Sequence, residues 1–246
     1  MHTIVLATQK GGSGKSTLAI GLALAARQAG FTVRLIETDP QGTLSNWHRR
    51  RNNDDIVVEP IYYAADFEPR LNMLAESGLQ LAIVDTAAGL SAVTTAAIRH
   101  SDLCLIPARP TVADIEATAS TLSVARAWQR PYSFVLNQTP IRGQRIDNAA
   151  NTLAEEAALD LAEVLARPLI AMRNDHQDSL ASGLAVNEFA PTGKSTEEIR
   201  GLWRWVETRL ELSAGNLLID QVISAADGML HAATELAADE TPVLTS

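Results

Sequence analysis

The residues best suited to bind phosphate lie in one glycine-rich run near the start of the chain: Gly11, Gly12, Ser13, Gly14, Lys15, Ser16 and Thr17. Glycines let the backbone turn tightly, so that consecutive N–H groups can point at one anion. An apolar run at residues 3–7 precedes the loop and a helical pattern follows it, which is the context that such a loop requires. The run therefore predicts a binding site for the phosphates of a nucleotide at a helix N-terminus.

Two side chains of this run have defined roles in nucleotide chemistry. Lys15 is placed to reach the β- and γ-phosphates, and the hydroxyl of Ser16 is placed to ligate Mg²⁺. The usual loop also has a glycine at the position of Gln9, whereas this chain carries an additional lysine, Lys10, five residues before Lys15. A second ammonium group there needs a physical reason, and the structural alternative is a solvated surface lysine.

Two acids follow apolar runs and extend the candidate site. Asp39 follows the run at residues 32–37, and Asp85 ends the run at residues 81–85. Acids at the carboxyl ends of parallel strands beside a phosphate loop lie where ligands bind. An acid in the position of Asp85 holds Mg²⁺, usually through water, in P-loop NTPases. For Asp39 the structural alternative is a turn formed by Asp39 and Pro40.

Runs of apolar and β-branched residues predict strands at residues 3–7, 32–37, 81–85, 103–107 and 133–137. Helical patterns predict helices at residues 16–29, 68–77, 113–130 and 147–161. Because the strand runs are apolar throughout rather than alternating, they are typical of parallel strands covered on both faces. We therefore expect an α/β fold, a doubly wound, mostly parallel sheet with helices on both faces.

The last third of the chain predicts two further helices. Ser195 and Glu198 form a capping-box pattern that opens a helix. Residues 216–236 repeat apolar side chains at helical spacing and contain no Lys or Arg. We therefore expect a domain at residues 1–212 and an acidic C-terminal extension at 213–246, an amphipathic helix followed by a frayed end. We also interpret the basic run at residues 48–51 as a solvated helix end.

Composition excludes several classes of protein. The chain has 246 residues, with 20 basic and 29 acidic side chains and a net charge of −9. A single cysteine, Cys104, excludes an intrachain disulfide and a site with several cysteine ligands, and its surroundings predict a buried strand position. The longest apolar runs fall short of the roughly 20 residues that span a bilayer. We expect a cytoplasmic protein without a secretory signal.

The run from Lys10 to Ser16 resembles the deviant phosphate loop of the ParA/MinD family, which also includes nitrogenase iron proteins and arsenite-pump ATPases. The resemblance covers roughly residues 1–210. It implies that two subunits sandwich two molecules of ATP, each with Mg²⁺. Lys10 would cross to the nucleotide of the second subunit, as an arginine finger does. The single cysteine argues against the iron–sulfur branches.

The same resemblance assigns roles to residues outside the loop. Asp39 matches the second acid of the family motif Asp-x-Asp-Pro-Gln and would position the attacking water near Mg²⁺, while Glu37 replaces the first acid. Asn137 would contact the adenine base, with an Asx turn before Pro140 as its structural alternative. Arg173 and Lys194 fall in two segments that contact DNA in ParA-type members, which makes them our DNA-binding candidates.

Three functions fit these observations. The first is a ParA-type partition or positioning ATPase, a nucleoid-associated dimer with ATP that binds DNA without sequence preference and is stimulated by a ParB-like or other adaptor protein. The second is a MinD-like membrane switch, which requires a basic amphipathic helix that this acidic tail does not provide. The third is a metabolic enzyme of the same superfold, which Lys10 and the motif around Asp39 disfavour. We expect the first function and no membrane binding.

Overall fold

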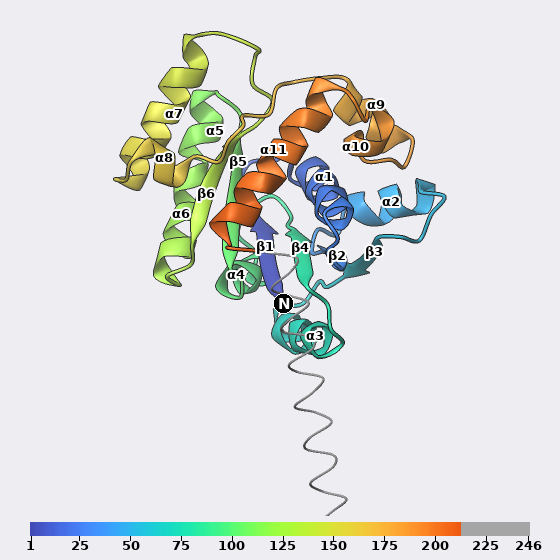
Figure 1. The fold of residues 1–246 in the computed structure, drawn as a ribbon. Coiled ribbons are helices and arrows are strands. Elements are labelled where there is room, and N and C mark those ends of the chain that lie inside the picture. Colours follow the sequence, from blue (N-terminus) through green and yellow to red (C-terminus); the bar gives the residue numbers. More distant parts are fainter. Residues whose placement is uncertain (213–246) are drawn as a thin grey trace, which may run out of the picture. The chain divides into compact units, whose positions relative to one another are not determined.

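The computed structural model describes residues 1–212, shown as a coloured ribbon in Figure 1. Six strands form one sheet in the order β3-β2-β4-β1-β5-β6, and every neighbouring pair is parallel. They are β1 (His2–Leu6), β2 (Val33–Glu37), β3 (Val57–Pro60), β4 (Leu81–Asp85), β5 (Leu103–Ala108) and β6 (Tyr132–Leu136). The expected α/β class with a parallel sheet is confirmed, and each predicted strand begins and ends within one residue of an observed one.

The edge strand β3 has no counterpart among the predicted strands. Its four residues are partly or fully exposed, and one of them is Pro60. Glu59 accepts a hydrogen bond from Arg34 on the neighbouring strand β2 (2.9 Å) and is also paired with Arg70. A short strand with a charge and a proline is typical of a sheet edge, and it lacks the apolar run by which the other five strands are recognised.

Helices cover both faces of the sheet. On one face α1 (Lys15–Gln28) packs against α11 (Lys194–Arg209), and both lie in front of the strands in Figure 1. A Cβ atom on Gly21 of α1 would lie 3.1 Å from Ile199 Cγ2 of α11, so glycine permits this close approach. The helices of the other face are α3 (Ala64–Glu76), α4 (Ala92–Arg99), α6 (Thr118–Ala127) and α7 (Gln144–Ala157).

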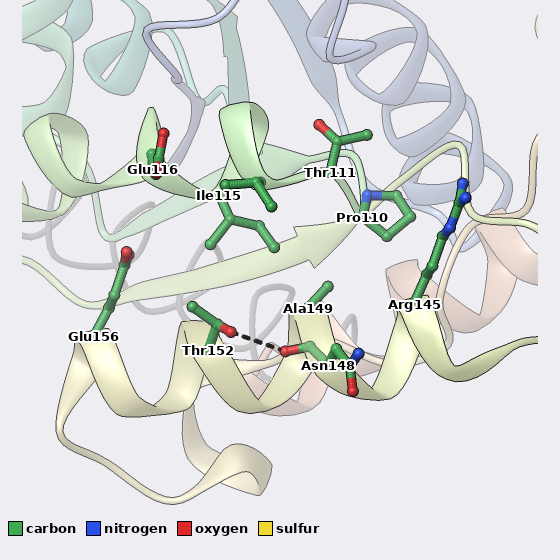
Figure 2. A pocket seen from close by; sticks show the side chains of 10 residues that line it. Pro110, Thr111, Ile115, Glu116, Arg145, Asn148, Ala149, Thr152 and Glu156 are labelled. Atoms are coloured by element: carbon green, nitrogen blue, oxygen red, sulfur yellow. Dashed lines mark hydrogen bonds between the residues drawn. The ribbon is translucent and has the colours of Figure 1, made fainter.

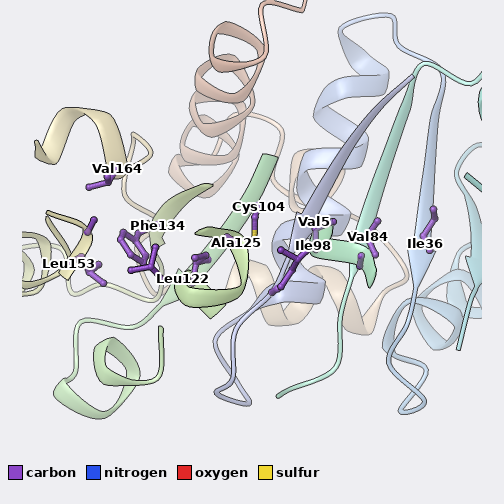
Figure 3. Close-up of a cluster of buried hydrophobic side chains, with 14 of the residues drawn as sticks. Val5, Ile36, Val84, Ile98, Cys104, Leu122, Ala125, Phe134, Leu153 and Val164 are labelled. Atoms are coloured by element: carbon purple, nitrogen blue, oxygen red, sulfur yellow. The ribbon is translucent and has the colours of Figure 1, made fainter. Parts of the chain in front are cut away.

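The core on this second face is a continuous apolar cluster (Figure 3). Val5, Val84 and Cys104 contribute from the central strands, and all three are fully buried. Leu122 of α6 and Leu153 of α7 pack against them. The predicted strand position of Cys104 is therefore confirmed, and burial raises the pKa of its thiol to about 12. A thiol in this state is inert.

Two predicted helices are each divided in the structure. The pattern at 113–130 forms α5 (Val112–Glu116) and α6, separated by a turn at Ala117 beside which Thr118 Oγ1 donates a hydrogen bond to the Ile115 carbonyl (2.7 Å). The pattern at 147–161 belongs to α7, which ends before the left-handed Ala158 (φ 49°), and to α8 (Leu161–Val164). The remaining helices are α2 (Thr43–Arg50), α9 (Asp175–Ala181) and α10 (Val186–Phe189).

The predicted capping box at Ser195 and Glu198 is wrong. Helix α11 begins two residues earlier than that pattern requires, with Gly193 as its N-cap. The Ser195 hydroxyl instead donates to Asp175, and Glu198 accepts a hydrogen bond from the Ala171 N–H (3.0 Å). Tertiary partners have replaced the local capping bonds. The apolar face expected for this helix is buried as predicted, at Ile199, Leu202, Trp203 and Val206.

The C-terminal extension expected at residues 213–246 lies outside the described residues. Within residues 1–212, none of the helices is both long and apolar enough to cross a membrane.

Candidate functional site

The glycine-rich loop joins the carboxyl end of β1 to the start of α1. Its backbone conformation requires glycine at two positions. Gly12 and Gly14 both have left-handed φ angles, 74° and 90°. A Cβ atom on Gly14 would also lie 2.2 Å from Asn137 Nδ2, so any side chain there would displace the loop. Within residues 1–212 no side chain caps the start of α1, which leaves its first N–H groups available for an anion.

Polar side chains from two other segments hold the loop in place. Asn137, which follows β6, donates from Nδ2 to the Ser13 carbonyl (2.7 Å). Its neighbour Gln138 donates from Nε2 to the Gly12 carbonyl (2.9 Å). Gln9, at the position where the usual pattern has glycine, accepts a hydrogen bond from the Ser120 hydroxyl of α6 (2.7 Å). The departure at Gln9 thus serves to anchor the loop.

Lys15 is the buried cation of the loop. Lys15 is only 7% exposed, and its Nζ atom lies 3.5 Å from the Lys10 carbonyl oxygen. Burial lowers the pKa of this ammonium group, while the charges of Asp85 and Asp39 act in the opposite direction. A partly desolvated ammonium beside free backbone N–H groups is suited to bind a polyanion.

Asp85 is the buried anion of the site, at the end of β4. It is 1% exposed, and neither carboxylate oxygen has a hydrogen bond of normal geometry among residues 1–212. Burial raises the pKa of this carboxyl to about 7, although the Ser16 hydroxyl and the Lys15 ammonium favour its charged form. A buried carboxylate with so few partners is costly, so these oxygens are suited to a further ligand such as a metal ion.

The donors around Asp85 fit Mg²⁺. They are two unpartnered carboxylate oxygens and the nearby hydroxyl of Ser16, and all are the hard oxygen ligands that this ion prefers. Asp39 lies close enough for its charge to raise the pKa of Asp85 and to favour the charged form of Lys15. The structure therefore brings together the three residues that the sequence predicts at the metal, and Lys15 beside them.

The turn after β2 gives its two acids different tasks. Asp39 is partly exposed, and its Oδ1 accepts the Gln41 N–H (2.9 Å), which fixes the turn and leaves Oδ2 free among the described residues. Glu37 is fully buried and accepts the backbone N–H groups of Leu44 (2.6 Å) and Ser45 (3.3 Å) at the start of α2. Glu37 therefore acts as the cap of α2, which its side chain is long enough to reach.

Lys10 lies on the other side of the loop, toward the segment that follows β5. Its charge helps to lower the pKa of Asp114 in α5, where hydrogen bonds from Arg109 and Thr111 outweigh the opposing effect of burial. The Lys10 side chain is itself partly exposed. It is thus available to a second molecule at the same edge of the sheet as the loop.

The two DNA-binding candidates differ in their surroundings. Arg173 forms an ion pair with Glu198 of α11 (2.5 Å), so its charge is already balanced. Lys194 is exposed in the first turn of α11, and no ion pair with a described residue involves it. Neither residue belongs to the phosphate loop.

The interpretation of residues 48–51 as a solvated helix end is wrong for Arg51. Helix α2 does end at Arg50, but the side chain of Arg51 is only 1% exposed. It forms paired hydrogen bonds with Asp55 (2.7 and 2.9 Å) and with Glu188 of α10 (2.6 and 2.7 Å). It also lies over the Trp47 ring, 5.1 Å from its centroid. The run of three arginines gave no signal that distinguishes this buried one.

Two cavities were not predicted. A small one of about 130 Å³ lies beside the loop, between Thr17 of α1, Asn137 and His176 of α9. A larger one of about 620 Å³ lies between the start of α5 and α7, where Pro110 and Ile115 face Asn148 and Thr152 (Figure 2). The larger cavity is lined by none of the loop residues. Only the small cavity belongs to the candidate site.

Both the sequence and the fold have relatives among known proteins. The family described as the CobQ/CobB/MinD/ParA nucleotide binding domain matches residues 4–212. The maintenance of carboxysome distribution protein A of Halothiobacillus neapolitanus is 26% identical over 203 residues, which cover 80% of this chain and 91% of that protein.

Solved structures show the same fold at lower identity. The MinC:MinD cell division protein complex of Aquifex aeolicus matches with a TM-score of 0.70 and 16% identity, over 85% of this chain and 96% of that one. A Cyanothece McdA variant in complex with ATP matches with a TM-score of 0.69 and 17% identity, over 87% of this chain and 97% of that one. The family match spans nearly all of the described residues.

Proposed function

The chain belongs to the CobQ/CobB/MinD/ParA nucleotide-binding family, and from that premise we propose that it is a ParA-type ATPase. It binds ATP with Mg²⁺ and hydrolyses it to ADP and phosphate. The observation that carries this proposal is the buried Asp85, whose two unpartnered oxygens lie close to Ser16 and Lys15 at the glycine loop. Such an arrangement has a clear use only when a metal ion and an anion occupy it.

Each residue of the site contributes to binding or to the reaction. The backbone of the loop and Lys15 hold the phosphates, and Ser16, Asp39 and Asp85 hold Mg²⁺. Mg²⁺ held by these residues would supply positive charge to the phosphates during the reaction. The free Oδ2 of Asp39 orients the attacking water, because Oδ1 is fixed by the Gln41 N–H. Lys10 of a second subunit adds positive charge at the transferred phosphoryl group.

We further propose that ATP closes a homodimer that binds DNA without sequence preference and positions a cargo, with hydrolysis stimulated by an adaptor protein. This places the protein on the nucleoid, in the cytoplasm. The similarity to a protein named for maintaining carboxysome distribution supports a positioning role. Of the two DNA-binding candidates, the exposed Lys194 is better placed than Arg173, whose charge Glu198 balances.

The test is binding of a non-specific DNA duplex by wild type and by Lys15→Ala, each with and without Mg·ATP. Lys15→Ala removes the buried charge of the loop and should abolish nucleotide binding or nearly so. We expect DNA binding that requires ATP, is lost in Lys15→Ala and weakens steeply with salt through counterion release. ATP-dependent sedimentation with anionic liposomes instead of DNA would reject this function in favour of a membrane switch. Near-normal ATP affinity in Lys15→Ala would reject the phosphate-loop assignment.

A further inference from the structure

Half of the hydrogen-bonding capacity of the Asn137 amide is used within the protein itself. One of its N–H groups binds the Ser13 carbonyl, and its Oδ1 accepts the Gln138 N–H (2.9 Å). The residue is only 5% exposed. A primary amide has two donors and two acceptor positions, so half of its capacity is committed to holding the loop. Asn137 thus keeps one N–H and one acceptor position for a nucleobase, which leaves room for a second residue to bind the base.

The arrangement of the strands indicates where a nucleobase would lie. Asp39 and Asp85 follow β2 and β4, on one side of β1 in the sheet, whereas β5 and β6 lie on the other side. The metal and the terminal phosphates must therefore lie toward β4. The nucleoside must leave the loop in the opposite direction, toward the end of β6. There it meets the small cavity between α1, the segment after β6 and α9.

One side chain of this cavity is without partners. Both ring nitrogens of His176 are buried and form no hydrogen bond with any described residue. Burial lowers the pKa of this imidazole against the opposing effect of Glu198 and Asp175, so a neutral ring with one donor and one acceptor nitrogen is favoured. Two unsatisfied buried nitrogens are costly, and a native structure usually explains such groups by a ligand or bound water.

We propose that His176 supplies a side-chain hydrogen bond to the nucleobase of bound ATP, in the cavity beside the phosphate loop. The inference rests on the proposed binding of ATP and adds a residue that determines affinity for the base. The imidazole gains in the complex the partner that it lacks in the free protein. Asn137 then serves to position the loop, which is the task its hydrogen bonds already show.

The test compares two ligands that share phosphates but differ in the base. Calorimetry would measure the affinities of ATP and of inorganic tripolyphosphate for wild type, His176→Leu and His176→Gln, and thermal unfolding would be followed without ligand. We expect His176→Leu to bind ATP about five- to tenfold more weakly and tripolyphosphate as wild type does. His176→Gln keeps a donor and an acceptor and should recover most of the ATP affinity.

Stability without ligand separates this role from a structural one. Leucine removes two unpaired nitrogens, so the unfolding temperature of His176→Leu should stay equal or rise. His100→Leu, at the end of α4 and outside the cavity, is the matched control and should leave both affinities unchanged. Unchanged ATP affinity in His176→Leu would overturn the inference. So would an equal loss for both ligands together with a lower unfolding temperature. If the wild-type protein bound neither ATP nor tripolyphosphate, the proposed function would fail together with this inference.

Discussion

Arg51 and Glu188 lie 137 residues apart in the sequence and are joined by two hydrogen bonds of 2.6 and 2.7 Å. This pair fastens the end of α2 to α10. The start of the same helix is capped by Glu37, two residues before Asp39. Helix α2 therefore connects the turn that carries Asp39 with the segment around α9 and α10 through contacts at both of its ends.

Replacing Arg51 by methionine should destabilise the protein strongly. The change removes the guanidinium that lies over Trp47, leaves Glu188 without its cation and leaves Asp55 with Arg27 alone. Because breaking a buried ion pair leaves uncompensated charge, we expect the free energy of unfolding in urea to fall by about 3 kcal/mol. The neighbouring exposed Arg49→Met should change it by less than about 0.5 kcal/mol. Equal losses in the two variants would contradict the buried network.

Asp85→Asn should stabilise the metal-free protein while removing its metal site. The folded-state pKa of Asp85 is raised to about 7, so the charged form is disfavoured in the fold. Stability is therefore fully present below the unfolded-state pKa and is lost as pH rises through about 7. In the presence of a chelator the variant should gain on the order of 3 kcal/mol at pH 8 and nothing near pH 4. Thermal unfolding across this range measures the difference, and a gain independent of pH would contradict it.

The parts of the site that depend on local sequence could be predicted, and those that depend on tertiary contacts could not. The phosphate loop is a contiguous run whose residue types carry its chemistry, and Asp85 ends an apolar strand that is equally plain. The burial of Arg51 depends on Glu188, far along the chain, so its position in a basic run is misleading. His176 could not be singled out from the sequence either, because what distinguishes it is that its ring nitrogens have no hydrogen-bond partner among residues 1–212.

Changes of charge at Lys194, Arg173 and Glu198 should alter the affinity for DNA. Lys194→Glu should weaken ATP-dependent DNA binding without lowering basal ATPase activity, and should reduce the slope of affinity against salt by about one or two phosphate contacts. Arg173→Glu should also weaken it. Because Glu198 balances the charge of Arg173, Glu198→Gln should strengthen DNA binding if Arg173 faces the duplex. Unchanged affinity in the double variant at 173 and 194 would move the DNA-binding surface to other basic residues, Arg49 and Arg50 or Arg142 and Arg145.

The action of Lys10 on a second subunit can be tested by mixing two inactive variants. Lys10→Ala should bind ATP but hydrolyse it poorly, and Asp39→Ala should bind ATP and remain as a trapped dimer on DNA. In a mixed dimer, the site of the Lys10→Ala subunit keeps its own Asp39 and receives Lys10 from the other subunit. The second site lacks both groups. If each subunit used its own Lys10, neither site would be complete, so only action across the dimer restores turnover.

With random pairing of equal amounts of the two variants, we expect about a quarter of the wild-type ATPase rate. The pure variants are the controls, and tagged subunits would establish that mixed dimers form. Mixed dimers no more active than their parents would refute the crossing of Lys10.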